Sequence, residues 1–209
     1  PILKTIALLT SFAIIACSQD IVVENTQNRN DGDAINKICI TGKNFQIDDD
    51  TRSSVTIGES GASFAWDEDD VIGIFPDKGD QVSFAMDEGA GTQTATFSGG
   101  GWALKSSAKY AAYYPHVYEN RDLTKIPVSY LGQTQNGNAN TDHIGAYDFM
   151  AASVATPSNG AVSFDLKHMG CLVMLQTNLG EAKNLNFITL KAEVEAFTMS
   201  GFIDLTTNI

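Results

Sequence analysis

Apolar and polar residues alternate in short runs along most of the chain, and Gly, Asn and Asp separate one run from the next. In "VSFAMD" the alternation places Val82, Phe84 and Met86 on one face, as expected for a strand with one buried face. Further runs of this kind carry Ile38 and Ile40; Ala95 and Phe97; Tyr110, Ala112 and Tyr114; and Val162, Phe164 and Leu166. Many short strands separated by turn residues predict an all-β protein that is built as a sandwich.

Two stretches interrupt this alternation. The run "GCLVMLQT" (170–177) is nearly all apolar, which predicts a central strand that is buried on both faces. The run "NTDHIGAYDFMAAS" (140–153) allows one turn of helix at most, because Gly145 disfavours a longer helix. Elsewhere the helical period is nearly absent, so we expect no substantial helix.

The strand pattern restarts after residue 178, and its last run, "FTMSGFIDLTTNI", predicts a hairpin that turns at Ser200–Gly201. We therefore expect residues 36–177 to form a first β-sandwich and residues 178–209 to begin a second, incomplete one. Half a sandwich would leave an unpaired strand edge, so we expect the natural chain to continue beyond Ile209. Without those further strands, we expect the tail beyond residue 178 to be frayed.

The N-terminus has the layout of a secretory signal. Lys4 supplies a cationic start, and the apolar run from Ile6 to Ala16 follows it. This run is shorter than the roughly 20 apolar residues that span a bilayer as a helix. A core helix would need a polar face, which this run lacks. The pattern therefore predicts a leader peptide.

The residues at the end of the leader, "Ile14-Ile15-Ala16-Cys17", resemble the bacterial lipobox. This resemblance implies that Cys17 receives a diacylglycerol and that the signal peptide, residues 1–17, ends at this cysteine, with the cut directly before it. The amino group that the cut frees is then acylated, for example with palmitate. Several acyl chains anchor a protein stably, where one chain is marginal. Residues 18–35 are rich in Asn, Asp and Gln and predict a polar tether.

The charge balance narrows the class of partner. The chain of 209 residues contains 25 acidic and 13 basic residues, so its formal net charge is -12. Nucleic-acid binding requires clustered Lys and Arg, which argues against a nucleic-acid partner. An acidic, solvated surface instead fits an exported protein.

The two other cysteines, Cys39 and Cys171, lie in strand-like runs. In an oxidising compartment they could form a disulfide, and the alternative is a pair of buried free thiols. The sequence leaves both open. His168 lies near Cys171, but no second close pair accompanies it, so a zinc site is not expected.

No catalytic arrangement stands out. "GESGAS" (58–63) lacks the spacing of a nucleophile elbow, and "DEDD" (67–70) lacks the ligand spacing of a calcium loop. The three histidines lie in separate segments. We therefore expect no enzyme, no metal and no cofactor. Four tyrosines could stack on a sugar or fill the core: Tyr110, Tyr113, Tyr114 and Tyr118.

Six runs, in order, resemble the fimbrillin family, the lipoprotein precursors of type V pilus subunits. These runs are "FAWDEDDVIGIF", "ATFSG", "YAAYYP", "IPVSYLGQTQNG", "YDFMAAS" and "VSFDLKHMGCLVML". They cover residues 38–177, which correspond to the first domain of the family. "TMSGFIDLTT" resembles the opening of the second domain.

The resemblance implies two transthyretin-like β-sandwiches in tandem, the second truncated here, and an outer-membrane, surface-exposed lipoprotein that assembles into an adhesive fimbria. In this family an Arg-specific protease removes an N-terminal segment with its first strand, and a neighbouring subunit donates a strand to the vacated groove. Such strand addition combines main-chain hydrogen bonds with side-chain pockets. The implied partners are other fimbrial subunits, the protease, membrane lipid and a surface receptor.

Two arginines are candidates for the processing site. Arg52 follows the predicted strand at 38–47 in an acidic loop, and a cut there would release that strand. A cut at Arg29 would leave the strand in place, so we favour Arg52. A Cys39–Cys171 disulfide would keep the cut strand attached.

Two alternatives remain open on the sequence. One is a pilus anchor or tip component that does not polymerise. The other is a monomeric, anchored β-sandwich lipoprotein that binds glycan through an exposed aromatic platform, such as Trp102 or the tyrosines of 110–118.

Overall fold

The computed structural model describes residues 34–35, 37–42, 54–58, 61–99, 104–105, 108–137, 140–158, 161–175, 187–191, 193, 198–207 and 209. These residues all belong to the unit Gly32–Ile209. The described residues include no α-helix. A short 3-10 turn, η1 (Gly145–Tyr147), lies where the sequence allows one helical turn at most.

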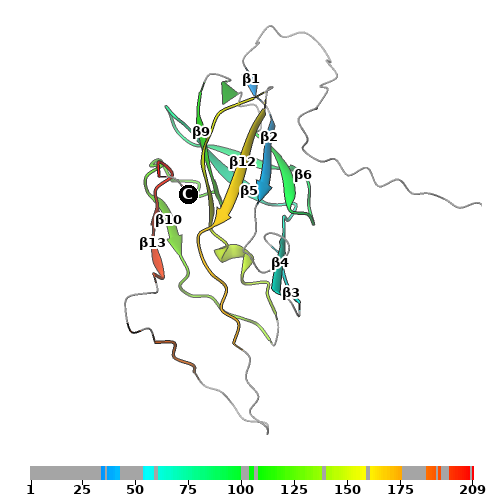
Figure 1. Ribbon diagram of the computed structural model, residues 1–209, viewed down its shortest axis with the longest axis vertical. Helices are drawn as coiled ribbons and strands as arrows, with labels where there is room; N and C mark the ends of the chain where they lie inside the picture. The colour runs from blue at the N-terminus through cyan, green and yellow to red at the C-terminus, as the bar shows by residue number, and fades with distance from the viewer. Residues whose placement is uncertain are drawn as a thin grey trace, which may run out of the picture. The chain divides into compact units, whose positions relative to one another are not determined.

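Seven strands form a closed hydrogen-bonded ladder in the order β11, β12, β2, β7, β6, β5 and β9, which returns to β11. The strands are β2 (Lys37–Gly42), β5 (Val71–Pro76), β6 (Val82–Glu88), β7 (Thr94–Ser98), β9 (Tyr110–Tyr114), β11 (Met150–Ala155) and β12 (Ala161–His168). All neighbouring pairs are antiparallel except β12 and β2, whose arrows run the same way in Figure 1. The all-β prediction is confirmed. The sheet curls and closes on itself, so that these strands leave no free edge.

Two-stranded sheets accompany the barrel within the described residues. The strands are β1 (Ala34–Ile35) with β8 (Leu104–Lys105), β3 (Ser54–Gly58) with β4 (Gly61–Ala65), and β10 (Ile126–Ser129) with β13 (Ser200–Ile203). The last pair joins segments that lie far apart in the sequence, and Figure 1 shows them side by side. The second sandwich that the sequence predicts stays a prediction.

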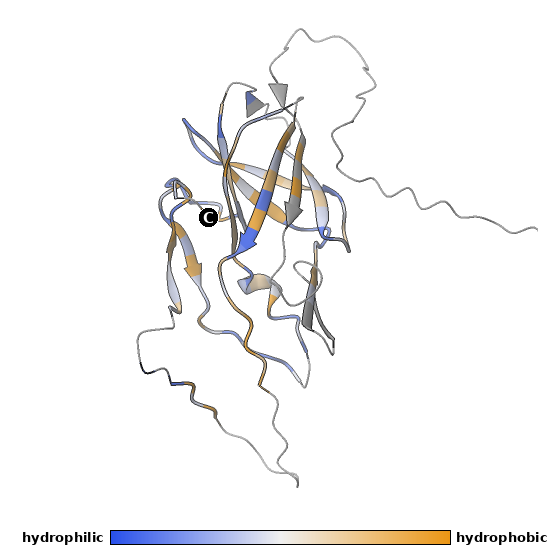
Figure 2. Cartoon of the chain, viewed as in Figure 1, coloured by the Kyte–Doolittle hydropathy of each residue, from blue (hydrophilic) through white to orange (hydrophobic). Residues whose placement is uncertain are grey.

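The main core lies inside the barrel and receives side chains from all seven strands. The predicted alternation is confirmed here, because the inward residues of β2, β6, β7 and β12 belong to this core or pack against it. Trp66, fully buried, sets its ring edge-on against Phe97 and Tyr114, with ring centroids 5.1 and 5.4 Å apart. Edge-on aromatic pairs of this kind add to the free energy gained by burial. Figure 2 shows the hydrophobic residues along these strands.

A second core lies on the outer face of β5, β9 and β11. It contains Phe75, Ala111, Tyr113 and Ala151 from the barrel, and Ile126, Ile203 and Leu205 from the region of β10 and β13. Because both faces are covered, every residue of β9 is buried. Alternation along β9 therefore distinguishes an inner core from an outer core, and not a buried face from a solvated one.

The end of the chain differs from its prediction. Ser200 and Gly201 lie inside β13 and do not form a hairpin turn. Ile203 and Leu205 are buried, so the expectation of a frayed tail is wrong for this segment. The physical reason is the apolar outer face of β5 and β9, which offers these side chains a place to leave water.

The predicted central strand after β12 is also wrong. Residues 171–175 form no strand, and Leu172, Val173, Met174 and Leu175 are exposed. The pairing of β12 with β11 ends at His168, and its pairing with β2 ends at Leu166. Among the described residues, no strand pairs with residues 171–175. Figure 2 colours this run as hydrophobic. Apolarity alone therefore did not place this segment in the core.

A buried hydrogen bond joins Asp148, just before β11, to His168 at the end of β12. His168 Nδ1 lies 2.5 Å from Asp148 Oδ1, and the two side chains are only 5% and 7% exposed. The pair sits beside the last rung of the ladder, Met150 to His168. The ring of Phe64 packs on the imidazole, with centroids 4.9 Å apart. This contact also ties the β3–β4 hairpin to the barrel.

Candidate functional site

Strand β2 fills a slot in the barrel wall between β12 and β7, which we call the β2 slot. On one side it pairs in parallel with β12, from Lys37 opposite Ala161 to Gly42 opposite Leu166. On the other side it pairs antiparallel with β7. In the described barrel, β12 and β7 are joined only through β2. Removing β2 would therefore open the barrel and leave two strand edges unpaired.

The side chains that β2 sends into the core are Ile38 and Ile40, and neither is exposed. Ile38 lies in register with Val162 of β12 and Phe97 of β7. Full burial of an isoleucine side chain contributes about 1.5–3 kcal/mol. In the β2 slot, β2 thus contributes two buried isoleucines to the core and pairs along both of its edges.

Because β2 lies near the start of the described chain, a single cut after it would separate it from the other barrel strands. Apart from the two-residue β1, it precedes every other described strand. Residues 43–53 connect it to β3, and Arg52 belongs to this connection. A cut there would divide β1 and β2 from the rest of the barrel. Arg52, Arg29 and Cys17 themselves lie outside the described residues.

A family model described as fimbrillin-like matches residues 51–209. This chain belongs to the fimbrillin-like family. The family resemblance found in the sequence is confirmed. The match begins beside Arg52 and leaves β2 outside.

Among solved structures, the fimbrillin-like chain is similar to a fimbrial protein from Bacteroides ovatus, at 18% sequence identity and a TM-score of 0.36. The similarity covers 64% of this chain and 29% of that one, so the chain spans less than a third of that protein's length. No curated protein sequence matches.

Cys39 and Cys171 differ in their placement. Cys39 lies in β2, in register with Ser163 and Thr96, and its side chain is outside the described residues. Cys171 is a free thiol and is exposed beyond the end of β12, so the prediction of a buried thiol is wrong for it. The disulfide that the sequence left open is not formed in this structure.

The acidic run 67–70 forms a turn in which Asp70 has a structural role. Asp67, Glu68 and Asp69 are exposed, whereas Asp70 is buried. Asp70 accepts hydrogen bonds from the hydroxyl of Tyr114 at 2.7 Å and from the backbone N–H of Asp67 at 2.8 Å. Among the described residues, no three His, Cys, Asp or Glu side chains gather as metal ligands. In the same part of the chain, no helix has the length and apolarity to cross a membrane.

The tyrosine cluster is divided between core and surface. Tyr110, Tyr113 and Tyr114 are buried, and burial raises the pKa of the Tyr110 and Tyr113 phenols. Tyr118 is 84% exposed. Trp102, the other aromatic candidate, lies outside the described residues.

Sequence reasoning missed the polar side chains that gather beside Tyr118. These are Asp80 and Gln81 at the start of β6 and Arg121 in the loop after β9. No local motif marks them, because the barrel brings together two distant segments of the chain. Gln81, for example, bonds to Val117, which lies 36 residues away in the sequence.

Proposed function

We propose that this chain is a structural subunit of an adhesive cell-surface fimbria that assembles by strand exchange at the β2 slot. The observation that supports it most directly is the place of β2. It precedes the other barrel strands, is paired on both sides and has two fully buried isoleucines, and residues 43–53, which include Arg52, connect it to β3.

In this proposal the precursor is exported and anchored to the outer membrane through lipid on Cys17. An Arg-specific protease then cuts at Arg52, and β1 and β2 become a separate fragment. Before the cut, the connection keeps β2 at a high effective concentration beside its slot. After the cut, β2 can leave, and a strand from a neighbouring subunit can take its place.

The vacated slot offers what a donor strand requires. The edges of β12 and β7 present main-chain donors and acceptors, and the places of Ile38 and Ile40 become apolar pockets. Strand addition uses both kinds of contact. If each subunit accepts one strand and donates another, the contact is head to tail and generates an open filament.

The test uses the full-length precursor without its lipid, treated with an Arg-specific protease and run unboiled on a denaturing gel. We expect a ladder of polymers from the parent and a single monomer band from Arg52→Lys, which keeps the positive charge but removes the protease's preferred residue. Arg29→Lys is the matched control and should still form the ladder.

A ladder from the Arg52→Lys variant would contradict the assigned processing site. A monomer band from the cleaved parent would contradict polymerisation and would favour an anchor subunit or a monomeric lipoprotein.

A further inference from the structure

A pocket lies between the start of β6 and the loop after β9. Its volume is about 440 Å³, within the range of roughly 300–1,000 Å³ that small-molecule sites occupy. Its lining includes Asp80, Gln81, Ser83, His116, Tyr118 and Arg121. The pocket is distinct from the β2 slot, because none of its residues lies in β2, β7 or β12.

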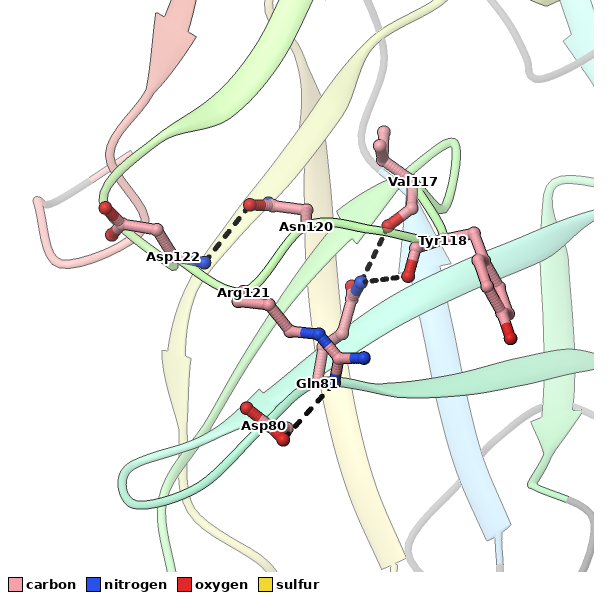
Figure 3. A network of polar contacts seen from close by, with 7 residues as sticks. All are labelled: Asp80, Gln81, Val117, Tyr118, Asn120, Arg121 and Asp122. Atoms are coloured by element: carbon pink, nitrogen blue, oxygen red, sulfur yellow. Dashed lines mark hydrogen bonds and ion pairs between the residues drawn. The ribbon is translucent and has the colours of Figure 1, made fainter.

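Hydrogen bonds from a core residue and from the backbone fix Gln81, one of the residues that line the pocket. Tyr113 is fully buried, and its hydroxyl donates to Gln81 Oε1 at 2.6 Å and accepts from the Val117 N–H at 3.1 Å. Gln81 Nε2 in turn donates to the Val117 carbonyl at 2.6 Å, as Figure 3 shows. The Gln81 side chain is therefore fixed from both ends of its amide. Side chains fixed in this way lose little conformational entropy when a ligand binds.

Gly73 in β5 leaves the space that the ring of Tyr113 occupies. A Cβ atom at Gly73 would lie 2.2 Å from Cε1 of Tyr113, so only glycine leaves room for the ring. The ring then carries its hydroxyl from the outer core to Gln81. A phenol is protonated at neutral pH and can donate, and burial raises the pKa of Tyr113 further above neutrality.

The rim combines an exposed aromatic ring with an exposed ion pair. Figure 3 shows Tyr118 and Arg121 projecting from the same loop. Arg121 Nη1 lies 3.2 Å from Asp80 Oδ2, with both side chains about two-thirds exposed or more, at 67% and 71%. An exposed pair of this kind contributes only about 0–1 kcal/mol to stability. Its donors and acceptors remain accessible to a ligand.

The pocket carries no net charge. Asp80 and Arg121 balance each other. Burial lowers the pKa of His116 below its ordinary value of 6.5, so the imidazole is neutral at pH 7 and offers one donor and one acceptor. The ring of His116 stands edge-on to that of Tyr118, with centroids 6.5 Å apart. The chain as a whole has a formal charge of -12, which disfavours an anionic ligand.

We infer that this pocket binds the pyranose ring of a neutral sugar, which rests on the proposed adhesive function and gives the chemical class of its receptor. One face of a pyranose consists of C–H groups, which pack on the negatively polarised face of an aromatic ring such as Tyr118. Its hydroxyl groups each donate and accept, and they match the Asp80 carboxylate, the Arg121 guanidinium and the imidazole of His116.

The sugar pocket does not depend on β2. Its residues stand on or beside β5, β6 and β9, and β5 pairs with β6 on one side and with β9 on the other. Sugar binding is therefore expected both before and after β2 is removed.

The test passes the full-length precursor with Arg52→Lys over agarose that carries galactose, N-acetylglucosamine or N-acetylneuraminic acid. This uncut form keeps the test independent of polymerisation. We expect retention on galactose or N-acetylglucosamine agarose and elution by the same free sugar. Tyr118→Ala should weaken this binding at least about tenfold, since aromatic anchors dominate small interfaces. Tyr118→Phe should retain it.

The matched control is Phe202→Ala, which removes an exposed aromatic side chain outside the pocket. It should bind as the parent does, and thermal unfolding should show that all variants are folded. Retention by Tyr118→Ala equal to that of the parent would overturn the assignment, as would binding to N-acetylneuraminic acid alone or to none of the three sugars. Failure of this test with a normal protease-dependent ladder would leave the strand-exchange proposal intact.

Discussion

A chain that begins at Ser53, and so lacks β1 and β2, is expected to unfold about 10 °C or more below the parent and to recover when a β2 peptide is added. The loss of Ile38 and Ile40 from the core removes about 1.5–3 kcal/mol for each side chain, before any main-chain hydrogen bond is counted. For a domain of this size, 1 kcal/mol corresponds to roughly 2–4 °C in Tm. The peptide would restore both the burial and the pairing with β12 and β7.

The measurement is thermal unfolding at rising concentrations of a peptide with the sequence of residues 34–42, "AINKICITG". A scrambled peptide of the same composition and a peptide with Ile38→Asp and Ile40→Asp are the controls, and neither should raise the Tm. If the shortened chain does not refold, the labelled peptide is instead offered to precursor already cut at residue 52. An unchanged Tm on removal of β2, or equal rescue by the scrambled peptide, would contradict the β2 slot as an acceptor site.

The second large effect is expected at the buried hydrogen bond between Asp148 and His168. Asp148→Ala should lower the free energy of unfolding by about 1–3 kcal/mol, because removal of one partner leaves the other buried polar group without this hydrogen bond. His168 lies opposite Met150 in the pairing of β11 with β12, and its imidazole packs against the ring of Phe64. The loss should therefore loosen both the barrel seam and the β3–β4 hairpin.

Denaturant unfolding of the purified protein measures this change. The matched control is Asp80→Ala, which removes one partner of the exposed pair with Arg121 and should change the free energy of unfolding by no more than about 1 kcal/mol. His168→Ala combined with Asp148→Ala should cost less than the sum of the single changes, as for two residues in contact. Equal effects of Asp148→Ala and Asp80→Ala would contradict a structural role for the buried pair.

Local sequence was sufficient wherever one face of a strand was buried. The alternation in the runs of β2, β6, β7 and β12 correctly identified the residues that point into the barrel, and the near absence of helical periodicity excluded a helical fold. The ordered motifs were also sufficient for the family, because their sequence order is preserved however the chain folds. The choice of Cys17 and Arg52 for export and processing also rests on their neighbours in the sequence, and it stays a prediction.

The sequence failed where burial depends on distant segments. "CLVML" has the composition of a buried strand but lies exposed, because no described partner strand runs beside it. The pattern of "GFIDL" predicts part of a hairpin in a separate domain, yet Ile203 and Leu205 pack against the outer face of the barrel. Apolar composition shows only that a residue gains free energy by leaving water, and not which surface will cover it.

By itself, then, the sequence determined the alternating strands β2, β6, β7 and β12, their inward faces and the fimbrillin-like family, since these follow from period-two alternation and from local motifs. Only the tertiary structure decided that β2 closes the barrel between β12 and β7, and that Asp80, Gln81, Tyr118 and Arg121 share one pocket. Both depend on which strands become neighbours. Strand pairing is set by the packing of the whole sheet, so no single stretch of the chain contains it.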